Sequence, residues 1–126
     1  MPKSLAQQVA EARASIENLS PDQVEQEMQQ GAMLVDIREP DEWERTGMIP
    51  GSVAAPRGML EWYADPGSSY HRPEFDPSKR VILTCAGGGR SALAALALQE
   101  LGYNNVAHLE SGVNGWIAEG KPTEPK

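Results

Sequence analysis

The sequence contains little cysteine and no long apolar run. Its one cysteine, Cys85, excludes a disulfide within the chain and leads us to expect a reducing, cytoplasmic compartment. The first residues, MPKSLAQQVA, lack the apolar core of a signal peptide. Glycine, glutamine or charged residues interrupt each aliphatic stretch before it reaches the length that crosses a bilayer, so we expect no membrane partner.

Basic residues are also in the minority. The 11 lysines and arginines stand against 18 acidic residues and give a formal net charge of −7, which argues against nucleic acid as a partner. If the substrate is a small anion, arginines and backbone N–H groups must create a local positive field. The two histidines, His71 and His108, lack the neighbouring ligands of a zinc site, so we expect neither a metal nor another cofactor.

The length of 126 residues fits one compact domain. Apolar residues at helical spacing predict a helix over 4–14, within an N-terminal extension that spans 1–15. The domain proper is expected over 16–120, followed by a polar tail at 121–126.

Short apolar runs alternate with helical patterns along the domain. Strands are predicted at 16–19, 32–37, 53–55, 80–84 and 106–109. Helices are predicted at 21–30, 41–45, 91–101 and 112–119, and residues 59–79 are expected to form a long loop anchored by aromatic side chains. This alternation predicts an α/β fold with a central, mostly parallel sheet flanked by helices on both faces.

Cys85 begins the segment CAGGGRS, which joins the clearest strand to the clearest helix. Ligands bind at this end of the strands in open α/β sheets. Three successive glycines allow the backbone to turn its N–H groups inward, while the helix N-terminus and Arg90 add positive potential. Such surroundings favour the nucleophilic thiolate. The alternative is that Cys85 is a small buried apolar residue beside a tight turn, but this explains neither the glycines nor Arg90.

The chain resembles the rhodanese-like domain family from about Ile16 to Trp116, and four segments carry the clearest resemblance. DIREPDEW at 36–43 resembles the D-x-R-x-x-x-E-aromatic segment, and CAGGGRS at 85–91 fits the C-x-x-G-x-R-S loop. GMIPGS at 47–52 resembles G-H-I-P-G-A, with Met48 in place of histidine. LESGVNGW at 109–116 resembles L-x-G-G-x-x-x-W, with Ser111 in place of a glycine.

The resemblance implies a thiosulfate sulfurtransferase in which Cys85 takes the outer sulfur of thiosulfate, or of a persulfide, and passes it to cyanide or a thiol. Cys85 is then the nucleophile and Arg90 the catalytic cation. The expected substrate-binding residues of the same loop are Ala86, Gly87, Gly88, Gly89 and Ser91. Because the chain has no second cysteine, the acceptor must come from outside, and the sequence does not identify an acceptor protein.

Two further arginines follow predicted strands at the same edge of the sheet. Arg38 and Arg57 are therefore candidates for the mouth of a positive pocket. For Arg38 the alternative is a structural ion pair with Asp36 or Glu42. Trp43 and Trp116, the tryptophans of two of these motifs, are expected to be packing residues. His108 is expected to be half-buried in its strand.

Two other functions use the same features. A cysteine thiolate in an anion-binding loop can also serve a phosphatase or an arsenate reductase. The dual-specificity phosphatases, which are related to the family that this chain resembles, use a loop that is one residue longer. Four residues separate Cys85 from Arg90 here, which suits sulfur better than phosphate. The second alternative is a sulfur-carrier or interaction module without turnover.

Overall fold

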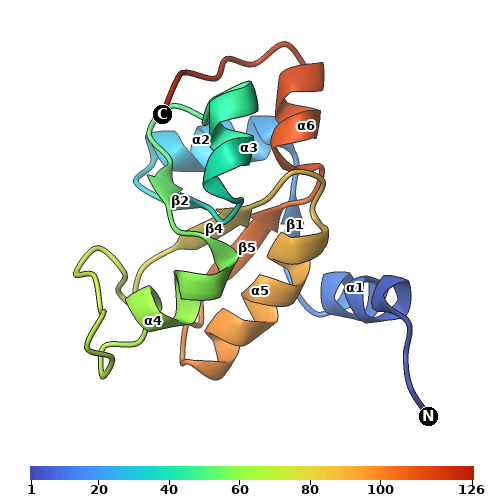
Figure 1. Ribbon diagram of the computed structural model, residues 1–126, viewed down its shortest axis with the longest axis vertical. Coiled ribbons are helices and arrows are strands. Elements are labelled where there is room, and N and C mark those ends of the chain that lie inside the picture. The colour runs from blue at the N-terminus through green and yellow to red at the C-terminus, as the bar shows by residue number, and fades with distance from the viewer.

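A five-stranded parallel sheet forms the centre of the computed structural model, which describes residues 1–126 (Figure 1). The strand order is β1-β5-β4-β2-β3, and each neighbouring pair is parallel. The strands are β1 (Glu17–Leu19), β2 (Met33–Asp36), β3 (Val53–Ala54), β4 (Val81–Thr84) and β5 (Val106–Leu109). All five lie within the predicted strand segments. β4 is the central strand, so the carboxyl end that leads to Cys85 lies mid-sheet.

The first two helices begin where the sequence provides side-chain caps. The Ser4 side chain caps α1 (Leu5–Ala14), and Ser20 and Gln23 form a reciprocal capping box at α2 (Pro21–Gln29). The other helices are α3 (Pro40–Thr46), α4 (Leu60–Ala64), α5 (Gly89–Glu100) and α6 (Gly112–Ala118), with a short 3₁₀ helix, η1, at Arg57–Met59. The α/β fold predicted from the sequence is therefore confirmed.

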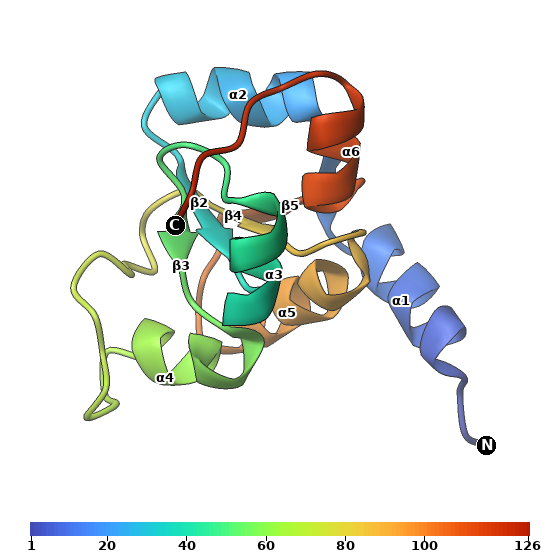
Figure 2. The same cartoon turned by 45° about the horizontal axis from the view of Figure 1, so that its top comes forward.

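Two apolar clusters cover the two faces of the sheet. Val35, Val81 and Leu83 pack with residues of α4 and α5, whereas Leu34 and Ile82 pack with residues of α2 and α6. Neighbouring strand residues point to opposite faces, so β2, β4 and β5 each contribute to both clusters. Figures 1 and 2 show α2 and α6 on one side of the sheet and α4 and α5 on the other.

The segment predicted as a loop over 59–79 is helical at its start. It contains the end of η1 and all of α4, whose buried Leu60 and Ala64 join the core beside α5. The expected polar tail also has structure, because Glu124 pairs with Met48 in an antiparallel bridge. No helix in the chain has the length and apolar character needed to span a bilayer.

Candidate active site

Cys85 follows the central strand β4 and is buried, with 1% of its surface exposed. Its Sγ accepts hydrogen bonds from the backbone N–H groups of Gly88 at 3.2 Å and Ser91 at 3.3 Å. Backbone donors aimed at a sulfur atom stabilise negative charge on it. The loop therefore places two backbone donors where they would stabilise a thiolate on Cys85.

Other N–H groups of this loop have no partner within the protein. The backbone N–H groups of Ala86, Gly87, Gly89 and Arg90 donate to no protein atom. Because α5 begins at Gly89, two of these groups are the unpaired donors of a helix N-terminus. They remain available to a ligand or to a sulfur atom carried on Cys85.

The three glycines of the loop are not equivalent. Only Gly88 has a positive φ, +97°, and a Cβ there would overlap the carbonyl oxygen of Glu110. A Cβ at Gly87 or Gly89 would meet no atom within 4 Å. The expectation that all three glycines permit an unusual backbone is therefore wrong for two of them; only Gly88 is required by the conformation.

The first residues of α6 are hydrogen-bonded to the backbone of the Cys85 loop. The N–H groups of Val113 and Asn114 donate to the carbonyl oxygens of Cys85 at 2.9 Å and Ala86 at 3.0 Å. A Cβ at Gly112, whose φ is +67°, would overlap the Ala86 carbonyl. This close approach explains why glycine is needed at 112, whereas Ser111 is tolerated at the neighbouring position.

Arg90 lies beside the site, but its charge is already paired. Its guanidinium donates to both carboxylate oxygens of Glu42, at 2.8 and 2.9 Å. This ion pair holds the pKa of Arg90 above its usual range and lowers the pKa of Glu42 to about 2. The expectation of a free cation at 90 needs correction, because Glu42 neutralises it in this conformation.

Arg38 is not at the pocket mouth. It is 2% exposed, and its Nε and one terminal nitrogen bind the buried carboxylate of Asp36. The remaining donors go to the Thr46 hydroxyl and to the carbonyl oxygens of Gly47 and Glu42. Since no guanidinium N–H is left for a substrate, the structure corrects the expected binding role of Arg38 to that of a structural ion pair.

Arg57 differs from Arg38 because it stays partly exposed. Its guanidinium binds Glu61 one turn further along, at 2.6 Å, and 34% of its side chain is accessible. It follows β3 at the same edge of the sheet as Cys85. The structure thus leaves this arginine accessible at the site edge.

A chain of side-chain hydrogen bonds runs from the loop to β1. The Ser91 hydroxyl lies 2.8 Å from Nδ1 of His108, and Nε2 of His108 lies 2.7 Å from Oδ1 of Asn18. His108 is fully buried rather than half-buried, because the α5 side of β5 is covered. Burial, aided by the charge of Arg13, lowers the pKa of His108 to about 4.

Several of these residues were not predicted as functional. The guanidinium of Arg13 on α1 reaches the carbonyl oxygens of Gly87 at 3.4 Å and Glu110 at 3.5 Å. Glu42 was visible in a motif, but nothing in the sequence paired it with Arg90. Asn18 and His108 are 90 residues apart, so no local pattern connects them.

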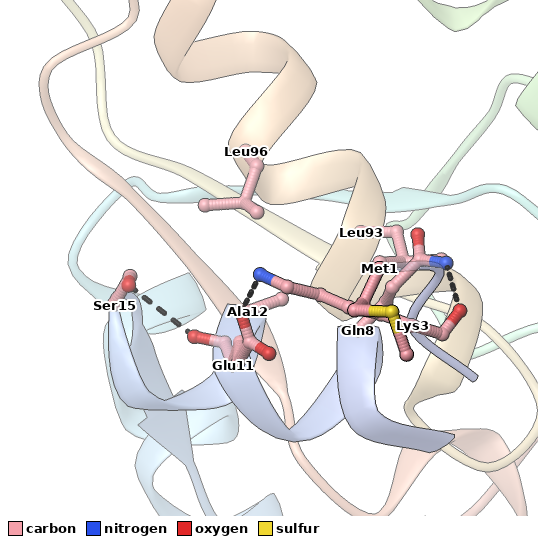
Figure 3. Close-up of a pocket in the computed structure, with 8 residues that line it drawn as sticks. All are labelled: Met1, Lys3, Gln8, Glu11, Ala12, Ser15, Leu93 and Leu96. Atoms are coloured by element: carbon pink, nitrogen blue, oxygen red, sulfur yellow. Dashed lines mark hydrogen bonds and ion pairs between the residues drawn. The ribbon is translucent and has the colours of Figure 1, made fainter. Parts of the chain in front are cut away.

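A separate hollow lies on the surface between α1 and α5 (Figure 3). It measures about 520 Å³, and Leu93 and Leu96 of α5 face Gln8 and Glu11 of α1 across it. None of its lining residues belongs to the CAGGGRS loop. It therefore adds nothing to the chemistry at Cys85. No group of three or more His, Cys, Asp or Glu side chains is placed to hold a metal ion.

Comparisons with known proteins agree with this arrangement. Residues 20–119 match the rhodanese-like domain family. A sulfurtransferase from Allochromatium vinosum is 31% identical over 90 residues, covering 71% of this chain and 76% of the relative. The thiosulfate:glutathione sulfurtransferase of Saccharomyces cerevisiae is 30% identical over 93 residues, covering 70% and 66%. The chain spans only 21% of a probable adenylyltransferase/sulfurtransferase, MoeZ, from Mycobacterium tuberculosis, to which it is 27% identical.

One solved structure resembles nearly the whole chain. It belongs to a protein of unknown function from Rhodopseudomonas palustris that is described as a possible tyrosine phosphatase. The two are 42% identical with a TM-score of 0.91, and the match covers 98% of this chain and 96% of the other. The similarity extends through α1, which lies outside residues 20–119.

Proposed function

The chain belongs to the rhodanese-like domain family, which among its relatives includes sulfurtransferases, and we propose that it carries sulfur on Cys85 as a persulfide. The observation that supports this is the loop around Sγ. Two N–H groups already donate to the sulfur, and four more have no partner in the protein. A ring of backbone N–H donors of this kind suits one additional sulfur atom bound to Sγ.

In the first half-reaction, the Cys85 thiolate attacks the outer sulfur of the donor. With thiosulfate as the donor, the S–S bond breaks and sulfite leaves with the bonding electrons. The free N–H groups of Ala86, Gly87, Gly89 and Arg90 then stabilise the negative outer sulfur of the persulfide. Arg57, at the same edge, remains a candidate for the donor's negative charge.

In the second half-reaction, cyanide or a thiolate attacks the outer sulfur of the persulfide. The persulfide S–S bond breaks, and Cys85 is released as a thiolate that Gly88 and Ser91 stabilise through their N–H groups. A thiol acceptor is consistent with the yeast relative, whose name joins thiosulfate to glutathione. The proposal therefore includes glutathione among the acceptors to be tested.

The direct test is the mass of the intact protein after exposure to thiosulfate. We expect a gain of one sulfur atom that cyanide removes, and no gain in the Cys85→Ser variant. A thermal melt of that variant controls for folding. A sulfur gain that persists in folded Cys85→Ser would show that another group carries the sulfur and would overturn the mechanism.

A phosphatase is the second candidate, because the similar R. palustris protein is described as a possible one. Two observations make this function weaker. Arg90 is bound to Glu42 rather than free to hold a phosphate, and the Glu42 pKa of about 2 leaves its carboxylate without a proton for a leaving alcohol.

An assay on two substrates separates these candidates. We expect the wild-type protein to turn over thiosulfate with cyanide and to leave an aryl phosphate nearly intact. Insertion of one glycine between Gly87 and Gly89 should lower sulfur transfer by widening the loop. Faster turnover of the aryl phosphate by the native protein would reverse the assignment of reaction class.

A further inference from the structure

The hydroxyl group of Ser91 has one proton and three acceptors within reach. His108 Nδ1 lies at 2.8 Å and the Gly88 carbonyl oxygen at 3.2 Å; Cys85 Sγ lies at 3.5 Å, where the thiol donates to the Ser91 hydroxyl oxygen and a thiolate can accept its proton. Only one of these atoms can receive the proton at a time. Which atom receives it decides whether Ser91 presents a proton or a lone pair to the sulfur.

Asn18 determines which nitrogen of His108 carries a proton. Its amide Nδ2 donates to the carbonyl oxygens of Arg13 at 2.9 Å and Ile16 at 3.1 Å, so Oδ1 is the atom that faces His108. An oxygen acceptor at 2.7 Å requires an N–H at Nε2. The neutral ring therefore has its lone pair on Nδ1, directed at Ser91.

We propose that His108 is a positioning residue for Cys85, because its neutral ring draws the Ser91 hydroxyl proton away from the sulfur. The shortest of the three distances is the one to Nδ1, in agreement with this direction of donation. A thiolate on Cys85 then receives N–H bonds from Gly88 and Ser91 but faces the lone pairs of the Ser91 hydroxyl. His108 thus opposes formation of the thiolate, although it lies beyond contact with the reacting atoms.

Burial, and after it the charge of a neighbouring arginine, keeps the His108 ring neutral by lowering its pKa. Arg13 of α1 is the charged side chain that acts on His108, and its positive charge disfavours an imidazolium. The groups that bind the ring from β1 and α5, Asn18 and Ser91, are uncharged. With a pKa of about 4, His108 stays neutral throughout the pH range in which a cysteine titrates.

The consequence for the reaction rests on the proposed function. The thiolate is the form that attacks a sulfur donor, but it is also the form that reacts with oxidants and alkylating agents. Withholding the Ser91 proton leaves more of the free cysteine as a thiol between turnovers. The persulfide has no proton on Sγ, so the network acts chiefly on the unloaded protein.

The test is the pH profile of Cys85 alkylation by iodoacetamide, followed by intact mass. In His108→Leu, which has a similar volume and no acceptor, the Ser91 hydroxyl is free to donate to the thiolate. A charge-assisted hydrogen bond from the Ser91 hydroxyl to the thiolate is stronger than one to the Gly88 carbonyl oxygen. We therefore expect the midpoint of the profile to fall by about one pH unit. Adding His108→Leu to Ser91→Ala should leave the midpoint of Ser91→Ala unchanged.

Asn18→Ala provides a second variant that spares the core, because Asn18 is only half-buried. Without Oδ1, the ring can carry its proton on Nδ1 and donate to Ser91, and the midpoint should again fall. An unchanged midpoint in both folded single variants, or the same shift from His108→Leu with and without the Ser91 hydroxyl, would overturn the inference. Alkylation needs no sulfur donor, so its outcome is independent of whether thiosulfate loads Cys85.

Discussion

Replacing Gly88 with alanine tests whether the loop around Cys85 depends on one backbone conformation. Gly88 has φ +97°, and an added Cβ would overlap the Glu110 carbonyl oxygen and lie 2.7 Å from an Arg13 nitrogen. An L-residue in the left-handed region costs about 1–2 kcal/mol by itself. Glu110 cannot move freely, because its N–H is bound to the carbonyl oxygen of Leu19 in β1.

Together the strain and the displacement of Glu110 should lower the free energy of unfolding by about 3 kcal/mol in Gly88→Ala. For a domain of this size, that is a fall in Tm of about 10 °C. Gly87→Ala and Gly89→Ala are matched controls, since both positions are open, and each should change stability by less than about 1 kcal/mol. Thermal and urea unfolding measure all three variants. If Gly88→Ala melts within about 2 °C of the controls, backbone strain at 88 does not shape the loop.

Three other changes test the charges and the buried network. Glu42→Gln should free Arg90 and lower the KM for thiosulfate about threefold. Asp41→Asn is the control, because it removes the same charge from the exposed pair with Arg45 and should leave the KM unchanged. Equal effects of the two variants on the KM would show that only the net charge matters. Arg38→Met should lower the free energy of unfolding by about 3–5 kcal/mol, because it leaves the buried Asp36 carboxylate unpaired, and Asp36→Asn added to it should restore part of the loss in a urea titration. His108 binds a proton below pH 6.5 in the unfolded chain but only below about pH 4 in the folded chain. The free energy of unfolding should therefore fall by about 3 kcal/mol as the pH drops through that window. Wild-type urea midpoints that stay level from pH 6.5 to 4 would contradict this.

The fold was predictable wherever local patterns carry the information. The buried strand β4 reads as an apolar run, and the cap of α2 reads directly as Ser20 with Gln23. The helix α4 was missed because its five residues, LEWYA, are too few for a periodic pattern and lack a side-chain cap. It is packing of Leu60 and Ala64 into the core that stabilises this helix.

The candidate site was predictable only in its local part. Cys85 and its loop are contiguous, so strand, turn and helix could be recognised together. The partners of Arg90 and Ser91 come from α3 and β5, far away in the chain. Sequence identifies arginine as a cation, but only the structure shows that Glu42 lies opposite its charge.

Backbone dipoles contribute more than the arginines of the motifs to stabilising negative charge at Cys85 in this acidic protein. Arg90 and Arg38 each bind a carboxylate, so neither contributes a net positive charge to the loop. What remains is the guanidinium of Arg13, which contacts the Gly87 carbonyl oxygen, and the backbone, with two N–H groups on Sγ and four others without a partner. These dipoles act over short distances, so they favour negative charge on an atom inside the loop more than charge elsewhere on the donor. The proposed sulfur transfer would need this selectivity, because every donor and acceptor, whatever its charge, would exchange the outer sulfur atom at this one position.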